Sequence, residues 1–123
     1  MEEGENEPSR FVFSIKGSVE GSRAYSILDV QVIAVNPETD KSPNAYELRF
    51  LLLGVFSAEE AIPAEALAEF ARMYTLSILW PYAREYTSDQ LRRAGQQFDA
   101  LPIINPQVVT EKLIEGGLVK MEI

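Results

Sequence analysis

Hydrophobic and polar residues alternate in three segments of the N-terminal half, which predicts β-strands over residues 11–17, 25–35 and 45–56. In the second segment, Asp29 and Gln31 mark a polar face, and four apolar residues share the other: Leu28, Val30, Val32 and Ala34. The third segment alternates at first and then becomes apolar on both faces through residues 51–53. This pattern indicates an antiparallel sheet with one wetter side.

The C-terminal half has helical periodicity instead. A first helix is predicted to begin either at a cap on Ser57 or at Pro63, and to continue to Arg93. Pro81 lies inside it and lacks a backbone donor, so we expect a kink or a restart there.

A second helix is predicted to follow a connector that ends with residues 101–104. Asn105 and Pro106 form an N-cap followed by proline at the first helical position, and Gly116 ends the helix after about Glu115. Residues 118–123 fit either an added edge strand or a loose tail.

The first predicted helix carries two apolar stripes. One comprises Leu67, Phe70, Ala71, Tyr74 and Ile78, and the other comprises Met73, Leu76 and Trp80. Its own sheet covers one side of a helix, so the second stripe predicts a subunit interface. The alternative is a deeper core within one chain.

These elements predict an α+β fold, in which an antiparallel sheet of three to four strands packs on a long kinked helix, with a second C-terminal helix. Residues 1–9 contain four glutamates and predict a flexible acidic tail. Residues 10–117 form the single domain, and residues 118–123 are the tail or edge strand.

Composition narrows the class of protein. The chain has 123 residues, of which 46% are hydrophobic, and this is enough for one core. No run is apolar enough to insert into a membrane, and the acidic N-terminus is unlike a secretory signal. We therefore expect a cytoplasmic protein.

The sequence contains no cysteine and no histidine, and its net charge is −8. Thiolate, imidazole and zinc chemistry are thereby excluded, and the acidic charge disfavours nucleic acid as a partner. No Gly-rich phosphate loop is present, so no cofactor, metal site or enzyme activity is predicted. Adjacent Arg84 and Glu85 are more simply an ion pair between subunits than a catalytic pair.

One segment resembles a known family. Residues 78–85 read Ile-Leu-Trp-Pro-Tyr-Ala-Arg-Glu, after Gly54-Val55-Phe56 and before Ser88, Arg93, Gly95 and residues 102–105. This order and spacing resemble the SecB family of protein-export chaperones, whose helix motif reads close to ILFPYARE. The resemblance covers about half of the chain.

The resemblance implies a SecB-like fold, a dimer or a tetramer assembled through helices and sheet edges, and ATP-independent holdase activity toward non-native polypeptides. It also implies delivery to the SecA motor, which docks on an acidic sheet face of the family's members. Arg49 opposes such docking, and the family's first strand is missing before the helix. A dedicated chaperone of a toxin–antitoxin system and a non-chaperone oligomeric scaffold of the same fold are the alternatives.

Two sets of site residues follow. The predicted client-binding residues are Phe56, Leu101, Ile103, Ile104 and Val108, because they flank the sheet end, the connector and the second helix. The predicted subunit-interface residues are Met73, Leu76, Trp80, Tyr82, Arg84 and Glu85.

Overall fold

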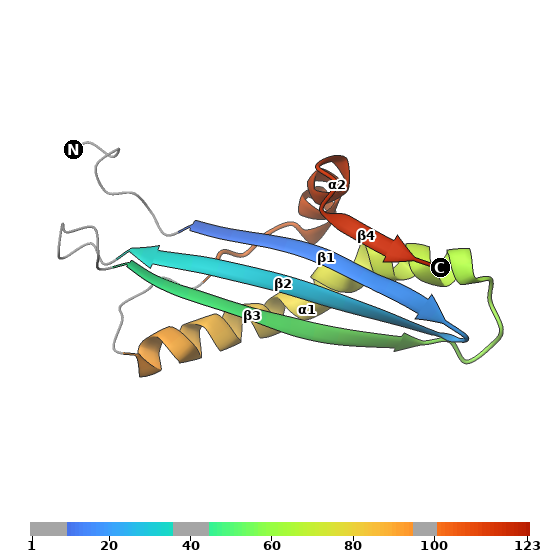
Figure 1. Ribbon diagram of the computed structural model, residues 1–123, viewed down its shortest axis with the longest axis horizontal. Helices are drawn as coiled ribbons and strands as arrows, with labels where there is room; N and C mark the ends of the chain where they lie inside the picture. The colour runs from blue at the N-terminus through green and yellow to red at the C-terminus, as the bar shows by residue number, and fades with distance from the viewer. Residues whose placement is uncertain (1–9, 36–44, 95–100) are drawn as a thin grey trace.

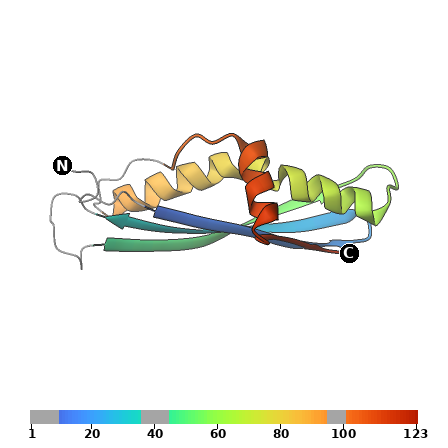
Figure 2. The ribbon, with the colours of Figure 1, turned by 90° about the horizontal axis from the view of Figure 1, so that it is seen from above.

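The computed structural model describes residues 10–35, 45–94 and 101–123. Its elements in chain order are β1 (Arg10–Glu20), β2 (Arg23–Val35), β3 (Ala45–Ser57), α1 (Ala64–Arg93), α2 (Pro106–Glu115) and β4 (Val119–Glu122). They form two layers, with the four strands on one side and both helices on the other (Figures 1 and 2). The predicted α+β class is confirmed. The predicted tail lies outside the described residues.

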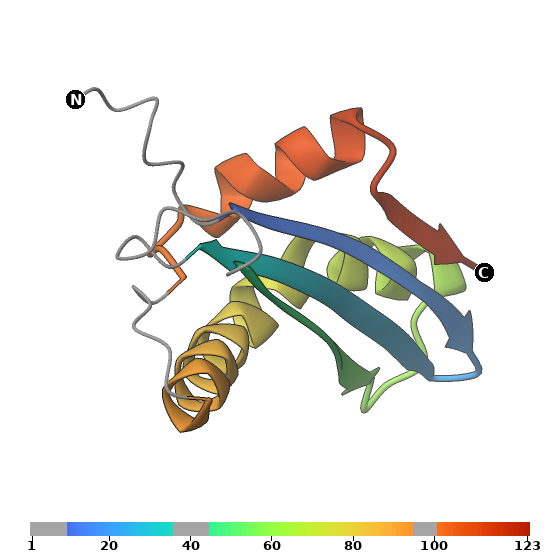
Figure 3. The same ribbon diagram turned by 60° about the vertical axis from the view of Figure 1, so that its left-hand side comes forward.

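The sheet has the strand order β3-β2-β1-β4 and is mixed. The hairpins β1–β2 and β2–β3 are antiparallel, whereas β4 pairs in parallel with β1, with Ile15 opposite Val119. The backbone N–H of Ile15 donates to the carbonyl of Leu118 at 2.8 Å. Residues 118–123 therefore include an edge strand, and the prediction of a purely antiparallel sheet is wrong. Both helices separate β4 from β3 in the chain and lie on one face of the sheet. After α2, β4 runs beside β1 in the same direction (Figure 3).

The inner face of β2 forms the centre of the core as its alternation predicted. Leu28, Val30 and Val32 are at most 1% exposed. From β1 and the helical layer they are joined by Phe13, Ile15, Leu76, Leu79, Trp80, Ala83, Leu101 and Leu113. A second, smaller cluster lies where α1 begins, and comprises Val19, Ala24, Leu67, Ala68 and Ala71.

Helix α1 starts at Ala64 with Pro63 as its N-cap residue, so the later of the two predicted starts is confirmed. Ser57 belongs to β3. The helix continues through Pro81, and its axis bends in the middle part (Figure 2). Proline removes one hydrogen bond from the helix, and the packing of both halves on the sheet keeps the helix in one piece.

A buried polar contact connects α1 to the sheet. The hydroxyls of Thr75 and Ser26 lie 2.8 Å apart and are hydrogen-bonded, and both residues are fully buried. The Thr75 hydroxyl also lies 2.6 Å from the carbonyl oxygen of Ala71. These partners satisfy polar groups that would otherwise destabilise the core.

Gly17 lies opposite Ser26 where β1 and β2 approach closely. A Cβ atom at Gly17 would lie 2.0 Å from the Tyr25 carbonyl oxygen and 2.9 Å from the Ser26 Cα. Only a residue without a side chain fits there, because both neighbours are backbone atoms.

We therefore expect Gly17→Ala to lower the free energy of unfolding by about 1–3 kcal/mol, since the two strands must separate. Urea denaturation followed by circular dichroism measures this change. Gly116→Ala is the matched control, because its nearest atom lies 3.5 Å away and the change should be small. Equal stability of both variants would contradict the close approach.

Candidate polypeptide-binding surfaces

The stripe that was predicted to face another subunit packs mainly inside this chain. Leu76 is 0% exposed and Trp80 is 4% exposed. The Trp80 ring lies 5.0 Å from the ring of Phe13 and 6.1 Å from that of Phe11, measured between centroids. The assignment of Leu76 and Trp80 to a surface that contacts another subunit therefore has to be corrected. They follow the alternative, a core within the chain, because this side of α1 faces β1 and β2.

The other predicted interface residues are distributed around the helix. Tyr82 and Glu85 are exposed, whereas Met73 and Arg84 are half-buried. Arg84 turns toward the connector, and Tyr82 belongs to a different row of side chains. The six residues thus do not form one surface.

The exposed apolar surface of α1 is a row of five residues, each four positions after the last: Phe70, Tyr74, Ile78, Tyr82 and Tyr86. We call this row the helix stripe. Its side chains are 41–63% exposed. Phe70, Tyr74 and Ile78 belong to the stripe that was expected to face the sheet. Tyr82 and Tyr86 continue it at the same spacing.

The helix stripe runs beside the inner side of β3. Tyr86 packs edge-on against Phe50 at 4.7 Å, and Phe70 packs edge-on against Phe56 at 5.7 Å. Phe70 also lies 4.9 Å from Tyr74. These aromatic contacts orient the stripe without covering it, so a partner meets a preformed apolar row.

Two side chains of α1 hold the connector in place. The Trp80 indole N–H donates to the carbonyl of Pro102 at 2.9 Å, and the Arg84 Nε–H donates to the carbonyl of Leu101 at 2.7 Å. Leu101 is 1% exposed as a result, while Ile103 is 84% exposed. The tryptophan and arginine of residues 78–85 therefore position the connector of their own chain.

The five predicted client-binding residues are not brought together. Leu101 is buried, which corrects its assignment as a contact, and Ile104 packs against the core. Ile103 and Val108 are exposed. Phe56 is half-buried against the smaller cluster at the other end of α1. Of these five residues, only Ile103 and Val108 expose a large apolar side chain to a partner.

Asn105 caps α2 as predicted. Its side-chain oxygen accepts from the backbone N–H groups of Gln107 and Val108 at 3.1 and 3.3 Å. This cap fixes the direction in which the chain leaves the connector.

The outer face of the sheet is the second exposed surface, because both described helices lie on the inner face. Leu51, Leu53 and Val55 of β3 are 59%, 60% and 48% exposed. We call these three residues the sheet patch. They continue the run in which the sequence was apolar on both sides.

Beside the sheet patch, Asp29 and Arg49 form an ion pair. Arg49 donates to the two carboxylate oxygens of Asp29 at 2.8 and 3.2 Å. This hydrogen bonding, with the positive charges of Arg49 and Lys16, lowers the pKa of Asp29 from its ordinary value of 3.8 against a weaker effect of burial. Arg49 is thus neutralised by its neighbour.

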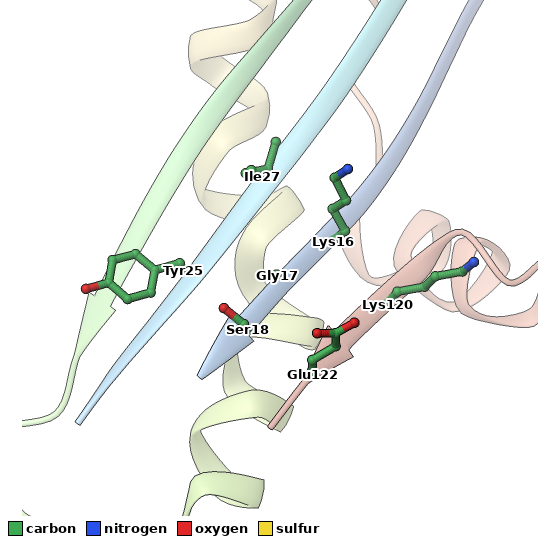
Figure 4. A pocket seen from close by; sticks show the side chains of 7 residues that line it. All are labelled: Lys16, Gly17, Ser18, Tyr25, Ile27, Lys120 and Glu122. Carbon is green, nitrogen blue, oxygen red and sulfur yellow. The ribbon is translucent and has the colours of Figure 1, made fainter. Parts of the chain in front are cut away.

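An open hollow of about 320 Å³ lies farther along the outer face (Figure 4). Its lining includes Lys16 and Ser18 of β1, Tyr25 and Ile27 of β2, and Lys120 and Glu122 of β4. The contribution of β4 was not predicted, although Lys120 and Glu122 alternate with Val119 and Met121 as in a strand.

Within the described residues, no group of three or more acidic side chains could hold a metal ion. Neither described helix is long and apolar enough to cross a membrane. Comparison with protein-family models, curated proteins and solved structures found no match. The surfaces above therefore carry the functional argument by themselves.

We expect Asp29→Asn to lower stability slightly at pH 7 and to have no effect in strong acid. The folded-state pKa of Asp29 lies below its ordinary value. The ion pair therefore stabilises the fold above about pH 4, and this contribution disappears as the pH falls through the folded-state pKa. Urea midpoints of both proteins between pH 2 and pH 7 measure the effect. A difference that did not become smaller as the pH fell toward 2 would contradict this origin.

We expect Arg84→Met to increase amide hydrogen exchange in residues 101–104, since the variant keeps the aliphatic stem and loses the donor to Leu101. Exchange followed by mass spectrometry measures the change. Arg92→Met is the control, because Arg92 is 75% exposed and bonds to Asp89 on its own helix. Unchanged exchange in the connector would show that Arg84 does not hold it.

Proposed function

We propose that this protein is an ATP-independent holdase, which binds apolar segments of non-native polypeptides and keeps them soluble. The observation that carries the proposal is the helix stripe, since five large apolar side chains lie in one row and remain about half exposed. With roughly 200 Å² for each such side chain, the row exposes on the order of 500 Å². Surfaces of this size on a single chain are commonly binding sites.

The composition of the helix stripe suits varied clients. Three tyrosines, one phenylalanine and one isoleucine offer flat apolar surfaces, and the tyrosine hydroxyls can bond to a client backbone. Exposed Ile103 and Val108 provide further apolar contacts. Several weak contacts along one long client add to a useful affinity.

The proposal includes a homo-oligomer of cytoplasmic location and SecB-like kind, either a dimer or a tetramer. Export of clients and a dedicated role in a toxin–antitoxin system remain two uses of the same activity. The charge of the outer sheet face gives little support to SecA docking, because Arg49 neutralises Asp29 and Lys16 adds a positive charge where an acidic surface would be required.

A non-chaperone oligomeric scaffold is the second candidate, and one feature of α1 favours it. The helix stripe is centred on Ile78, so two antiparallel copies of α1 would place Phe70 of each beside Tyr86 of the other. Glu65 near the start of one helix would then approach Arg92 near the end of its partner. In this arrangement, a second copy covers the stripe.

Suppression of aggregation tests the proposal. We expect the wild-type protein to prevent light scattering when a chemically unfolded model protein is diluted from urea without ATP. Ile78→Asp should abolish this protection, since a carboxylate in the middle of the stripe must stay hydrated. Ser77→Asp adds the same charge at an exposed position beside the row and should retain it.

Native mass spectrometry of the same variants separates the two candidates. Loss of protection at unchanged oligomeric mass assigns the stripe to clients. Dissociation of Ile78→Asp into monomers assigns the stripe to subunit contact. A wild-type protein that never prevents aggregation contradicts the holdase proposal.

A further inference from the structure

Near the middle of its length, the outer face of the sheet has an apolar half on β3 and β2 and a cationic half on β1 and β4. One row of register partners crosses all four strands, from Leu53 on β3 through Ile27 and Lys16 to Lys120 on β4. The β3 and β2 positions of this row are aliphatic, and the β1 and β4 positions are lysines. The division belongs to this level of the sheet, because exposed Val12 lies farther along β1 and the pair of Asp29 and Arg49 lies on β2 and β3.

The apolar half is exposed and separate from the helix stripe. The sheet patch is about half exposed, and the neighbouring Ile27 and Tyr25 are only partly covered. Both described helices pack on the opposite face (Figure 2). No described element of this chain shields the sheet patch.

The cationic half has an excess of positive charge. Lys16 and Lys120 are adjacent register partners, and like charges in such positions repel. Neither forms an ion pair within the described part of the chain. Glu122 lies in the same hollow and supplies one negative charge against two positive ones (Figure 4). The next acidic group, Asp29, is already bonded twice to Arg49.

The charge of this half is opposite to that of the whole chain. The net charge of −8 repels acidic partners at long range. The lysine pair is thus a local exception, and a complementary partner must present carboxylates next to an apolar surface. An anionic membrane is disfavoured, because its extended negative field would meet the remaining acidic surface as well.

The dimensions of the face indicate the form of this partner. Strands lie about 4.8 Å apart, so the sheet patch on β3 and Lys16 on β1 are separated by roughly 10 Å. An α-helix with its side chains is about 10–12 Å wide. A helix that lies along β2 therefore reaches the apolar half with one flank and the cationic half with the other.

We propose that the outer face of the sheet docks an amphipathic helix of a partner protein. The apolar side of that helix covers Leu51, Leu53 and Val55, and a Glu or Asp side chain on its flank lies over Lys16 and Lys120 at the level of Leu53. This docking surface is independent of the helix stripe and of client holding.

Two synthetic 18-residue helical peptides provide the probe. Both carry the same leucine face, and one has glutamates along a flank where the other has lysines. Fluorescence anisotropy of the labelled peptides measures their affinities. We expect the wild-type protein to bind the glutamate peptide at least tenfold more tightly than the lysine peptide, against the direction of its net charge.

The double variant Lys16→Glu/Lys120→Glu should reverse this preference. Arg92→Glu/Lys112→Glu is the matched control, since it changes the net charge by the same amount on the helical layer and should leave the preference unchanged. Leu53→Asp should weaken binding of both peptides at least tenfold. Circular dichroism confirms that each variant is folded.

A preference of the wild-type protein for the lysine peptide, equal affinities, or no binding of either peptide would overturn the proposal. So would a double variant that kept the wild-type preference. Vesicles of phosphatidylserine are a further probe, and tighter binding to vesicles than to the glutamate peptide would assign the face to lipid instead. Ile78→Asp should bind the glutamate peptide normally, so failure of the holdase proposal and failure of this one are distinguishable.

Discussion

The packing of α1 on the inner face of β1 and β2 is the constraint on which the rest of the structure depends. Leu76, Trp80 and Ala83 are almost completely buried there against Phe13 and the aliphatic row of β2. Burial of large apolar side chains supplies the dominant favourable free energy for a domain of this size. The helix of 30 residues carries a proline in its interior, and contact with the sheet along both halves compensates for the lost hydrogen bond.

The same packing determines the positions of the C-terminal elements. With Trp80 packed against the sheet, its indole N–H donates to the carbonyl of Pro102, and Arg84 one turn later donates to the carbonyl of Leu101. The connector leads into α2, which is capped by Asn105, and α2 leads into β4 beside β1. One side of α1 thus organises the core, and residues on that side also place the fourth strand.

Because a single helical layer covers a single face, two apolar surfaces stay exposed. The helix stripe lies on the side of α1 next to β3, and the sheet patch lies on the outer face of β3. They are separated by the thickness of the sheet and differ in their surroundings. Aromatic neighbours border the stripe, whereas charged and hydroxyl groups border the patch. This difference supports separate partners for the two surfaces.

By itself, the sequence determined the α+β class, the three long strands, the inner face of β2, the later start of α1 and the cap of α2, because these features depend on local periodicity and capping. It left the end of the chain open between strand and tail. It misassigned Leu76 and Trp80 of the second stripe of α1 and the exposed members of the first, whereas Leu67 and Ala71 of the first stripe are buried as expected. Residues four apart advance about 40° around a helix beyond a full turn, so an i, i+4 row gradually winds around it. Only the tertiary structure decides which row meets the sheet at each level, and which strand edge remains for β4, since both depend on contacts between residues far apart in the chain.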